Sequence, residues 1–114
     1  MFKTKEQIKQ WLDEMGVENY TINKNLTIDV KGSVDLSCKN LKEIPVQFNK
    51  VGESFSCSYN KLKSLKGAPK YVGWSFYCGF NLLKSLKGAP EYVGRSLSCY
   101  HNPFKFVPKW MENN

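Results

Sequence analysis

The sequence predicts an α+β fold: a short solenoid of four coils joined by a parallel β-sheet, preceded by a helix and a β-hairpin. Three observations support this prediction. Residues 64–73 return at 85–94 with nine of ten positions identical, at an offset of 21. The four cysteines are spaced by 19, 21 and 21 residues. Apolar residues near the N-terminus instead follow helical spacing. A fixed period of this length indicates stacked structural units.

Residues 1–31 are expected to form a cap, because the end coil of a solenoid exposes its core. Thr4 and Gln7 have the spacing of a capping box, and Gly16 is a typical helix stop. Between them, one helix face carries Ile8, Trp11, Leu12 and Met15. Residues 20–23 and 26–30 then read as two strands of a hairpin.

Residues 32–105 are predicted to form the four coils of a single domain that also includes both caps. Phe55 and Cys57 lie two residues apart, so their side chains point to one side of a strand. Stacking would place such residues in buried columns, with Cys38 as the first cysteine of its column. A two-residue deletion after Cys38 would explain the 19-residue spacing. The strands are expected near residues 34–38, 54–58, 75–79 and 96–100.

Glycine and proline mark the corners of each predicted coil. Gly52, Gly73 and Gly94 precede the strands and are expected to adopt positive φ. The Gly-Ala-Pro steps at 67–69 and 88–90 break any helix, so the return segments should be irregular or 3₁₀. The asparagine after each cysteine should satisfy turn groups of its own and neighbouring coils. Residues 106–114 are expected to cap the C-terminal end.

The repeated pattern Cys-x-x-Asn-x-Leu-x-x-Leu, with its Gly-Ala-Pro-x-x-Val-Gly connector, resembles short leucine-rich-repeat proteins of tailed bacteriophages. The opening, through residues 21–23 and 34–36, is similar to the usual start of that group. The resemblance implies a solenoid fold. By association alone it also implies an inhibitor of a host protein, such as an anti-CRISPR or anti-restriction factor.

The net charge is +7, and residues 39–114 carry it, with twelve Lys or Arg against four Glu. Residues 1–38 hold five Lys and six acidic residues. A basic surface favours an acidic partner, of which nucleic acid is one kind. No apolar run is long enough for a membrane helix, and no apolar signal core follows Met1. We therefore expect no membrane partner and a cytoplasmic location, that of the host if the chain is phage-encoded.

Catalytic chemistry finds little support in the sequence. His101 is the only histidine, and acidic residues are sparse in the repeats, among them Glu43, Glu53 and Glu91. No nucleophile triad, acid pair or phosphate loop can be assembled from these residues. The cysteines form no Cys-x-x-Cys pair, and a line of stacked thiols does not give tetrahedral zinc coordination. The expectation is a protein that is not an enzyme, has no cofactor or metal, and keeps its thiols reduced.

The repeats differ at positions that stacking does not constrain. Equivalent positions read Glu53, Trp74, Arg95, then Ser56, Tyr77, Ser98, then Ser58, Gly79, Tyr100, then Tyr59, Phe80, His101. Trp, Tyr and Arg dominate binding energies at interfaces. The predicted partner-binding residues are therefore Trp74, Tyr77, Phe80, Arg95, Tyr100, His101, Tyr59, Lys63 and Lys84. The alternative for the aromatic residues is that they fill a thin core.

Two functions stay open at this point. The first is a protein-binding inhibitor or adaptor that uses the aromatic strand face and a lysine rim against a host protein or complex with an acidic surface. The second is direct nucleic-acid binding, with Tyr77, Phe80 or Tyr100 stacking on bases. The rim would comprise Lys61, Lys63, Lys66, Lys84 and Lys87, which otherwise read as solvated surface charge.

Overall fold

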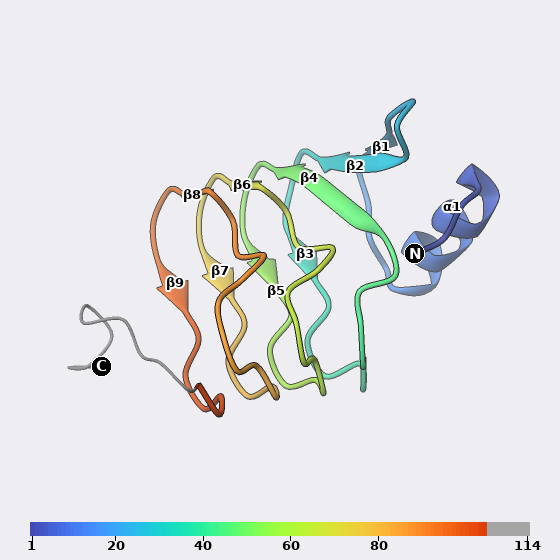
Figure 1. Cartoon of the computed structure of the whole chain (residues 1–114). Coiled ribbons are helices and arrows are strands. Elements are labelled where there is room, and N and C mark those ends of the chain that lie inside the picture. The colour runs from blue at the N-terminus through green and yellow to red at the C-terminus, as the bar shows by residue number, and fades with distance from the viewer. Residues whose placement is uncertain (105–114) are drawn as a thin grey trace.

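The computed structural model describes residues 1–104, which form a helix followed by a small β-solenoid of about three turns (Figure 1). The helix is α1 (Lys5–Glu14). The strands are β1 (Tyr20–Ile22), β2 (Thr27–Val30), β3 (Val34–Asp35), β4 (Gln47–Val51), β5 (Phe55–Ser56), β6 (Tyr71–Val72), β7 (Phe76–Tyr77), β8 (Tyr92–Val93) and β9 (Leu97–Ser98). No helix within these residues is long and apolar enough to cross a membrane.

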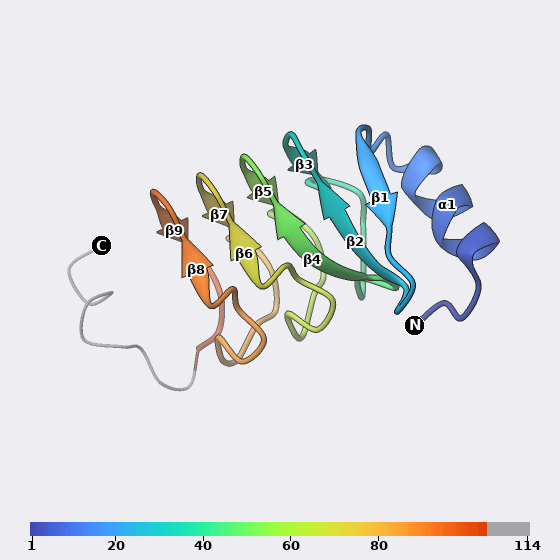
Figure 2. The same cartoon turned by 90° about the horizontal axis from the view of Figure 1, so that it is seen from above.

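The strands form two sheets (Figure 2). We call the sheet of order β3-β5-β7-β9 the face sheet and its members the face strands, and we call the sheet of order β1-β2-β4-β6-β8 the second sheet. Only the β1–β2 hairpin pairs antiparallel; the other pairings are parallel. The predicted parallel ladder at the cysteines is confirmed, since the Cys57 amide donates to Tyr77 O and the Cys78 amide to Ser98 O, both at 2.8 Å. The regular strands there are shorter than predicted. The predicted cap at 106–114 lies outside the described residues.

The core consists of columns of equivalent side chains from successive turns. Phe55 stacks on Phe76 with ring centroids 5.6 Å apart, and both are fully buried. Leu62 and Leu83 are also fully buried. Leu97, which pairs with Phe76 in the last described turn, is only partly buried. Burial of each repeat therefore depends on the next one, as expected for a solenoid.

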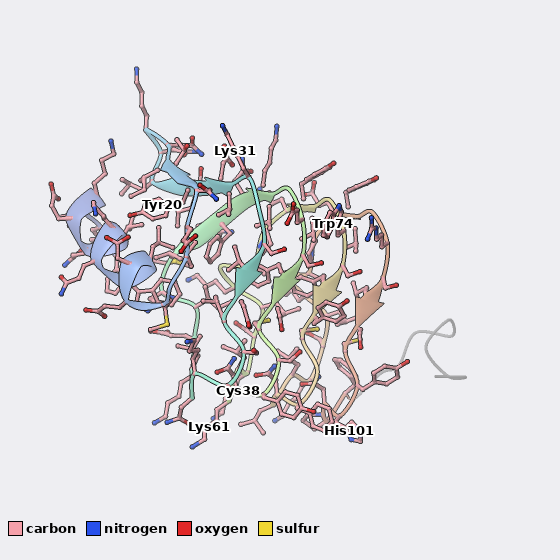
Figure 3. All side chains as sticks on the ribbon, turned by 180° about the vertical axis from the view of Figure 1, so that it is seen from behind. Tyr20, Lys31, Cys38, Lys61, Trp74 and His101 are labelled. Atoms are coloured by element: carbon pink, nitrogen blue, oxygen red, sulfur yellow. The ribbon has the colours of Figure 1, made fainter. Side chains whose placement is uncertain are left out.

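The first cysteine does not belong to the cysteine column. Val34 pairs with Phe55, so Leu36 occupies the position equivalent to Cys57, and Cys38 is equivalent to Tyr59. Cys38 is exposed and lies at the same end of the molecule as Lys61 and His101 (Figure 3). The predicted deletion is wrong, because the period is already 21 residues from β3 onward. The matching serines Ser33, Ser54, Ser75 and Ser96 carry this period in the sequence.

The glycines before the face strands serve a different purpose from the one predicted. Positive φ is found at Gly67 (95°) and Gly88 (91°), within the Gly-Ala-Pro connectors, and not at Gly52, Gly73 or Gly94. A Cβ atom on Gly73 would overlap the carbonyl oxygen of Gly52, and one on Gly94 would overlap that of Gly73. These three glycines are needed because the backbones of successive turns approach closely at that corner.

The second sheet was not predicted. Residues 61–70 have no helix or strand, as expected, but the return path then enters β6, which pairs with β4 and β8. Val51, Val72 and Val93 form the inward column of this sheet, and the first two are fully buried. A β-branched residue recurring every 21 positions is the sequence signal for it.

The N-terminal cap follows the prediction closely. The Thr4 hydroxyl accepts from the Gln7 amide at 3.2 Å, and the Gln7 side chain accepts from the Thr4 amide at 3.3 Å. The predicted helix face buries Ile8, Trp11 and Leu12, and Gly16 ends the helix with φ of 77°.

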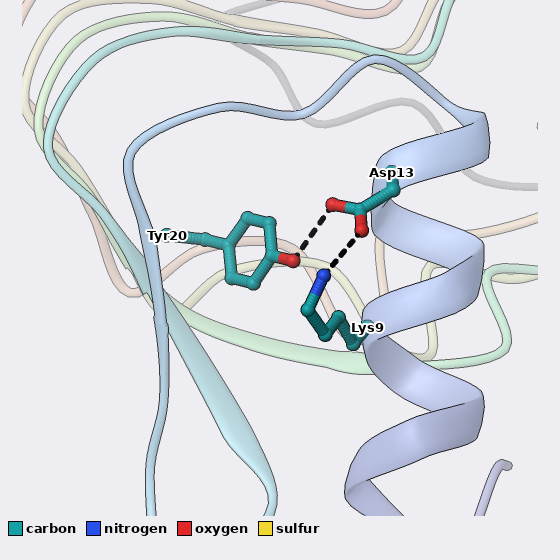
Figure 4. A network of polar contacts seen from close by, with 3 residues as sticks. All are labelled: Lys9, Asp13 and Tyr20. Atoms are coloured by element: carbon teal, nitrogen blue, oxygen red, sulfur yellow. Dashed lines mark hydrogen bonds and ion pairs between the residues drawn. The ribbon is translucent and has the colours of Figure 1, made fainter.

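A polar network joins this helix to the hairpin (Figure 4). The Asp13 carboxylate accepts from the Lys9 ammonium and from the Tyr20 hydroxyl, each at 2.7 Å. The hydrogen bond from Lys9, followed by that from Tyr20, lowers the pKa of Asp13. Both carboxylate oxygens are engaged, so the network links the start of β1 to the last turn of α1.

Candidate functional site

The aromatic residues predicted to contact a partner are all on the surface. The exposed fractions are 39% for Trp74, 40% for Tyr77, 40% for Phe80, 49% for Tyr100 and 55% for Tyr59. Arg95, His101, Lys63 and Lys84 are exposed as well. The alternative that these rings fill a thin core is therefore wrong for this set.

Three of these rings stack in a row where the chain leaves the face sheet. The ring centroids of Tyr59 and Phe80 are 4.3 Å apart with planes at 8°, and those of Phe80 and His101 are 4.2 Å apart at 23°. We call Tyr59, Phe80 and His101 the aromatic ladder. Phe80 is the middle member, and a neighbouring ring covers each of its faces.

The backbone at the ladder is left-handed. Tyr59, Phe80 and His101 have φ of 57°, 57° and 58°, and the equivalent Cys38 has 55°. This conformation costs an L-residue with a Cβ about 1–2 kcal/mol, and asparagine or glycine adopts it more readily than a large side chain. The turn therefore requires a left-handed residue here, and nothing in the turn requires an aromatic ring.

The asparagine that follows each ladder residue holds the turn. The Asn81 amide donates to the carbonyl oxygens of Cys57 (3.0 Å), Cys78 (3.1 Å) and Gly79 (3.2 Å). Its oxygen accepts from the Leu62 amide at 3.1 Å. This confirms the prediction that the asparagines bond to their own and the neighbouring repeat, and it fixes the backbone from which Phe80 projects.

The other predicted residues lie farther along the face. The Arg95 guanidinium sits over the Trp74 ring, 4.5 Å from its centroid, at the opposite end of β7 from the ladder. Tyr77 is the last residue of this strand and lies between Trp74 and Phe80 in the sequence. Phe80 follows Trp74 by six positions, which corresponds to at most about 20 Å along an extended chain. The structure thus divides the predicted site into two clusters and does not bring Arg95 together with the ladder.

Apolar and basic residues share the turns that carry the ladder. Leu82 is 44% exposed, and Tyr100 precedes His101 in the same turn. The turns at this end, residues 37–43, 58–64, 79–85 and 100–104, contain five lysines and a single glutamate. We define the rim patch as an apolar centre with a lysine border: Tyr59, Phe80, Leu82, Tyr100 and His101, bordered by Lys39, Lys61, Lys63 and Lys84.

Two features outside the predicted set emerge from the structure. Tyr71 and Tyr92 stack on the second sheet, with ring centroids 4.8 Å apart and exposed fractions of 41% and 52%. Their signal was the Tyr-Val-Gly shared by both connectors. A groove of about 660 Å³ also runs along the connectors, lined in part by Lys66, Lys70 and Lys87.

The thiols of Cys57, Cys78 and Cys99 are buried in the core. Burial raises the pKa of Cys57 to about 12. A hydrogen bond with Cys99 raises the pKa of Cys78, and the same bond lowers that of Cys99. Within residues 1–104 no three His, Cys, Asp or Glu side chains are grouped so that they could hold a metal ion.

Comparison with known proteins adds no family to this description. No protein-family model, curated protein or solved structure matches the chain. The described part of the chain is a small β-solenoid of parallel strands with an N-terminal helix.

Proposed function

We propose that the chain is a binding module, not an enzyme, and that it docks on a protein partner through the rim patch. The observation that carries this proposal is the aromatic ladder. Three rings occupy positions where the fold requires only a left-handed backbone, and they remain substantially exposed. Exposed aromatic rings reduce solubility unless they contact something.

The composition of the rim patch is that of a protein interface. Its centre is apolar and aromatic, and charged residues lie at its border, which is the arrangement in which a few central side chains supply most of the binding energy. Because the border is lysine-rich, the partner surface should be acidic. Trp74, Tyr77 and Arg95 extend the contact along the face.

We also propose a repeat type, a location and a partner class for the chain. We take the chain to be a four-coil, leucine-rich-repeat-like solenoid that acts in the cytoplasm. The resemblance to bacteriophage proteins makes a host defence complex, the target of an anti-CRISPR or anti-restriction inhibitor, the first partner class to test.

Nucleic acid is the second candidate partner, because the turns that carry the ladder contain five lysines and a single glutamate. The geometry of the ladder supports it less well. Base stacking needs an open ring face, and both faces of Phe80 are covered by Tyr59 and His101. Binding of this kind would rest mainly on phosphate contacts, and it would weaken steeply with salt.

The test compares two substitutions of equally exposed, stacked rings. Phe80→Asn removes the central ladder ring and suits a left-handed backbone, while Tyr71→Thr removes a ring from the second sheet and suits a strand. Each variant is immobilised and exposed to nuclease-treated bacterial lysate, and the captured protein is then purified and its Kd measured. We expect wild type and Tyr71→Thr to bind it and Phe80→Asn to lose most of the affinity. Equal binding by all three would refute the rim patch, and capture that nuclease abolishes would favour nucleic acid.

A further inference from the structure

We infer that the rim patch accepts an acidic peptide segment that carries an aromatic side chain. This inference rests on the proposed function and names the chemistry of the occupant. Three properties of the rim patch carry it: the direction in which the rings are exposed, the charge of the border, and the length of the ladder.

The ladder presents ring edges to solvent. Tyr59 and His101 cover the two faces of Phe80, so the 40% of Phe80 that remains exposed is largely its edge. An aromatic ring has a negative face and a positive edge. A row of edges therefore attracts the face of another ring, in edge-to-face geometry, or the oxygen of a carboxylate. A flat ring that must stack face to face has no place on the middle of the ladder.

The lysines at the border of the rim patch favour acidic residues next to the aromatic ring of the docked peptide. Lys61 follows Tyr59 by two residues, and Lys63 and Lys84 occupy equivalent positions one repeat apart. All three are exposed, and the only glutamate in the surrounding turns is Glu43. Carboxylates on both sides of a docked ring would meet positive charge, which also speeds encounter at low salt.

The length of the ladder favours a peptide segment over a globular face. Two ring spacings of 4.3 and 4.2 Å span it. An extended peptide advances about 3.3 Å per residue, so about three residues cover the ladder. A standard interface between two globular proteins takes about 20–30 residues from each partner, whereas the rim patch as defined above has only nine.

The experiment uses a blocked peptide, Asp-Glu-Asp-Phe-Asp-Glu-Asp, and the same peptide with leucine at its centre, titrated into the full chain by calorimetry. We expect the phenylalanine peptide to bind about threefold to tenfold more tightly than the leucine peptide, as edge-to-face pairing predicts. Phe80→Leu should abolish that preference, because leucine keeps an apolar side chain and removes the ring. Tyr71→Leu, a change of equal exposure on the second sheet, should leave it intact.

Other outcomes would overturn the inference. These are equal binding of the two peptides, no binding of either, or a preference that survives in Phe80→Leu. Tyr59→Leu provides a second ladder variant if Phe80→Leu fails to show the circular dichroism of the wild type. An eight-nucleotide oligothymidylate that binds while both peptides fail would point to nucleic acid. If the peptides fail but the Phe80-dependent capture of a protein persists, the proposed function stands and only the acidic aromatic segment is wrong.

Discussion

Replacing Asn81 by alanine tests whether the turn asparagines hold successive repeats together. The Asn81 side chain is 5% exposed and makes four hydrogen bonds, one of them to the amide of Leu62 in the preceding repeat. Alanine removes all four hydrogen bonds, but some of the four partner groups keep a second hydrogen bond and others do not. The stability cost depends on that difference.

The magnitude follows from which partners have a second bond. The Cys57 oxygen also accepts from Asn60, and the Cys78 oxygen also accepts from Asn102, both at 3.0 Å. The buried Leu62 amide has no such replacement among the bonds seen in residues 1–104. One orphaned buried amide costs about 1–3 kcal/mol, and weakening of the remaining bonds brings the expected loss to about 2–4 kcal/mol.

The same reasoning predicts a larger loss for Asn60→Ala. The Asn60 oxygen accepts from two amides, those of Lys39 (3.1 Å) and Leu41 (2.9 Å), and its amide donates to the Leu36 oxygen at 2.8 Å. We expect Asn60→Ala to exceed Asn81→Ala by about 1 kcal/mol, one further net hydrogen bond. Urea unfolding followed by circular dichroism measures both. A loss below 0.5 kcal/mol for Asn81→Ala, on the order of experimental error, or the reverse ranking, would refute this account of the turns.

Four further predictions address the core, the close corner, the hairpin and the thiols. Leu83→Ala should cost about 2–5 kcal/mol in urea unfolding, since Leu83 is fully buried; a change near zero would remove it from the core. Gly73→Ala should lower Tm sharply, because its Cβ would overlap a backbone oxygen of the preceding turn, and an unchanged Tm would contradict that close approach. Burial acts to raise the pKa of Asp29, but hydrogen bonds hold that pKa below its ordinary value. The stability that Asp29 contributes is therefore complete above about pH 4 and is lost at lower pH. Asp29→Asn should flatten the acid limb of a Tm–pH curve, and an unchanged limb would show that Asp29 is not responsible for it. In the native protein a maleimide should modify exposed Cys38 first and spare buried Cys57, whose pKa is about 12; equal rates would mean that the core opens readily.

The parts of the fold that could be predicted are those with a local signal. Thr4, Gln7 and Gly16 define the helix by their spacing, and the 21-residue identity of the connectors defines the stacking. The register of the first turn was misjudged because Cys38 resembles the other cysteines in type alone. Its backbone, with φ of 55°, identifies it as a ladder position. The type of one residue therefore indicates the register less reliably than a series of equivalent residues at a constant spacing.

The candidate site could likewise be predicted only in part from the sequence. That Trp74 and Phe80 face solvent could be inferred, because they vary between repeats at positions free of stacking constraints. The stacking of Phe80 between two rings, and the pairing of Trp74 with Arg95 at the other end of β7, could not be inferred, because side-chain direction depends on the path of the turn. The stacked Tyr71 was missed because its position repeats unchanged, and constancy was read as a sign of packing.

Because the repeat period is a uniform 21 residues, the number of repeats in this fold can change without disturbing the contacts between neighbouring repeats. Each inner repeat contacts its neighbours through equivalent groups, including the serines at positions 33, 54, 75 and 96. The hydroxyl of each of the first three accepts from the amide of the next serine in this series. Duplicating residues 75–95 in tandem would insert a module whose two sides already fit those of its neighbours. Both ends of the protein would stay as they are, and the row of rings would grow by one step of about 4.8 Å. Duplication of a repeat could therefore lengthen the recognition surface without a new fold.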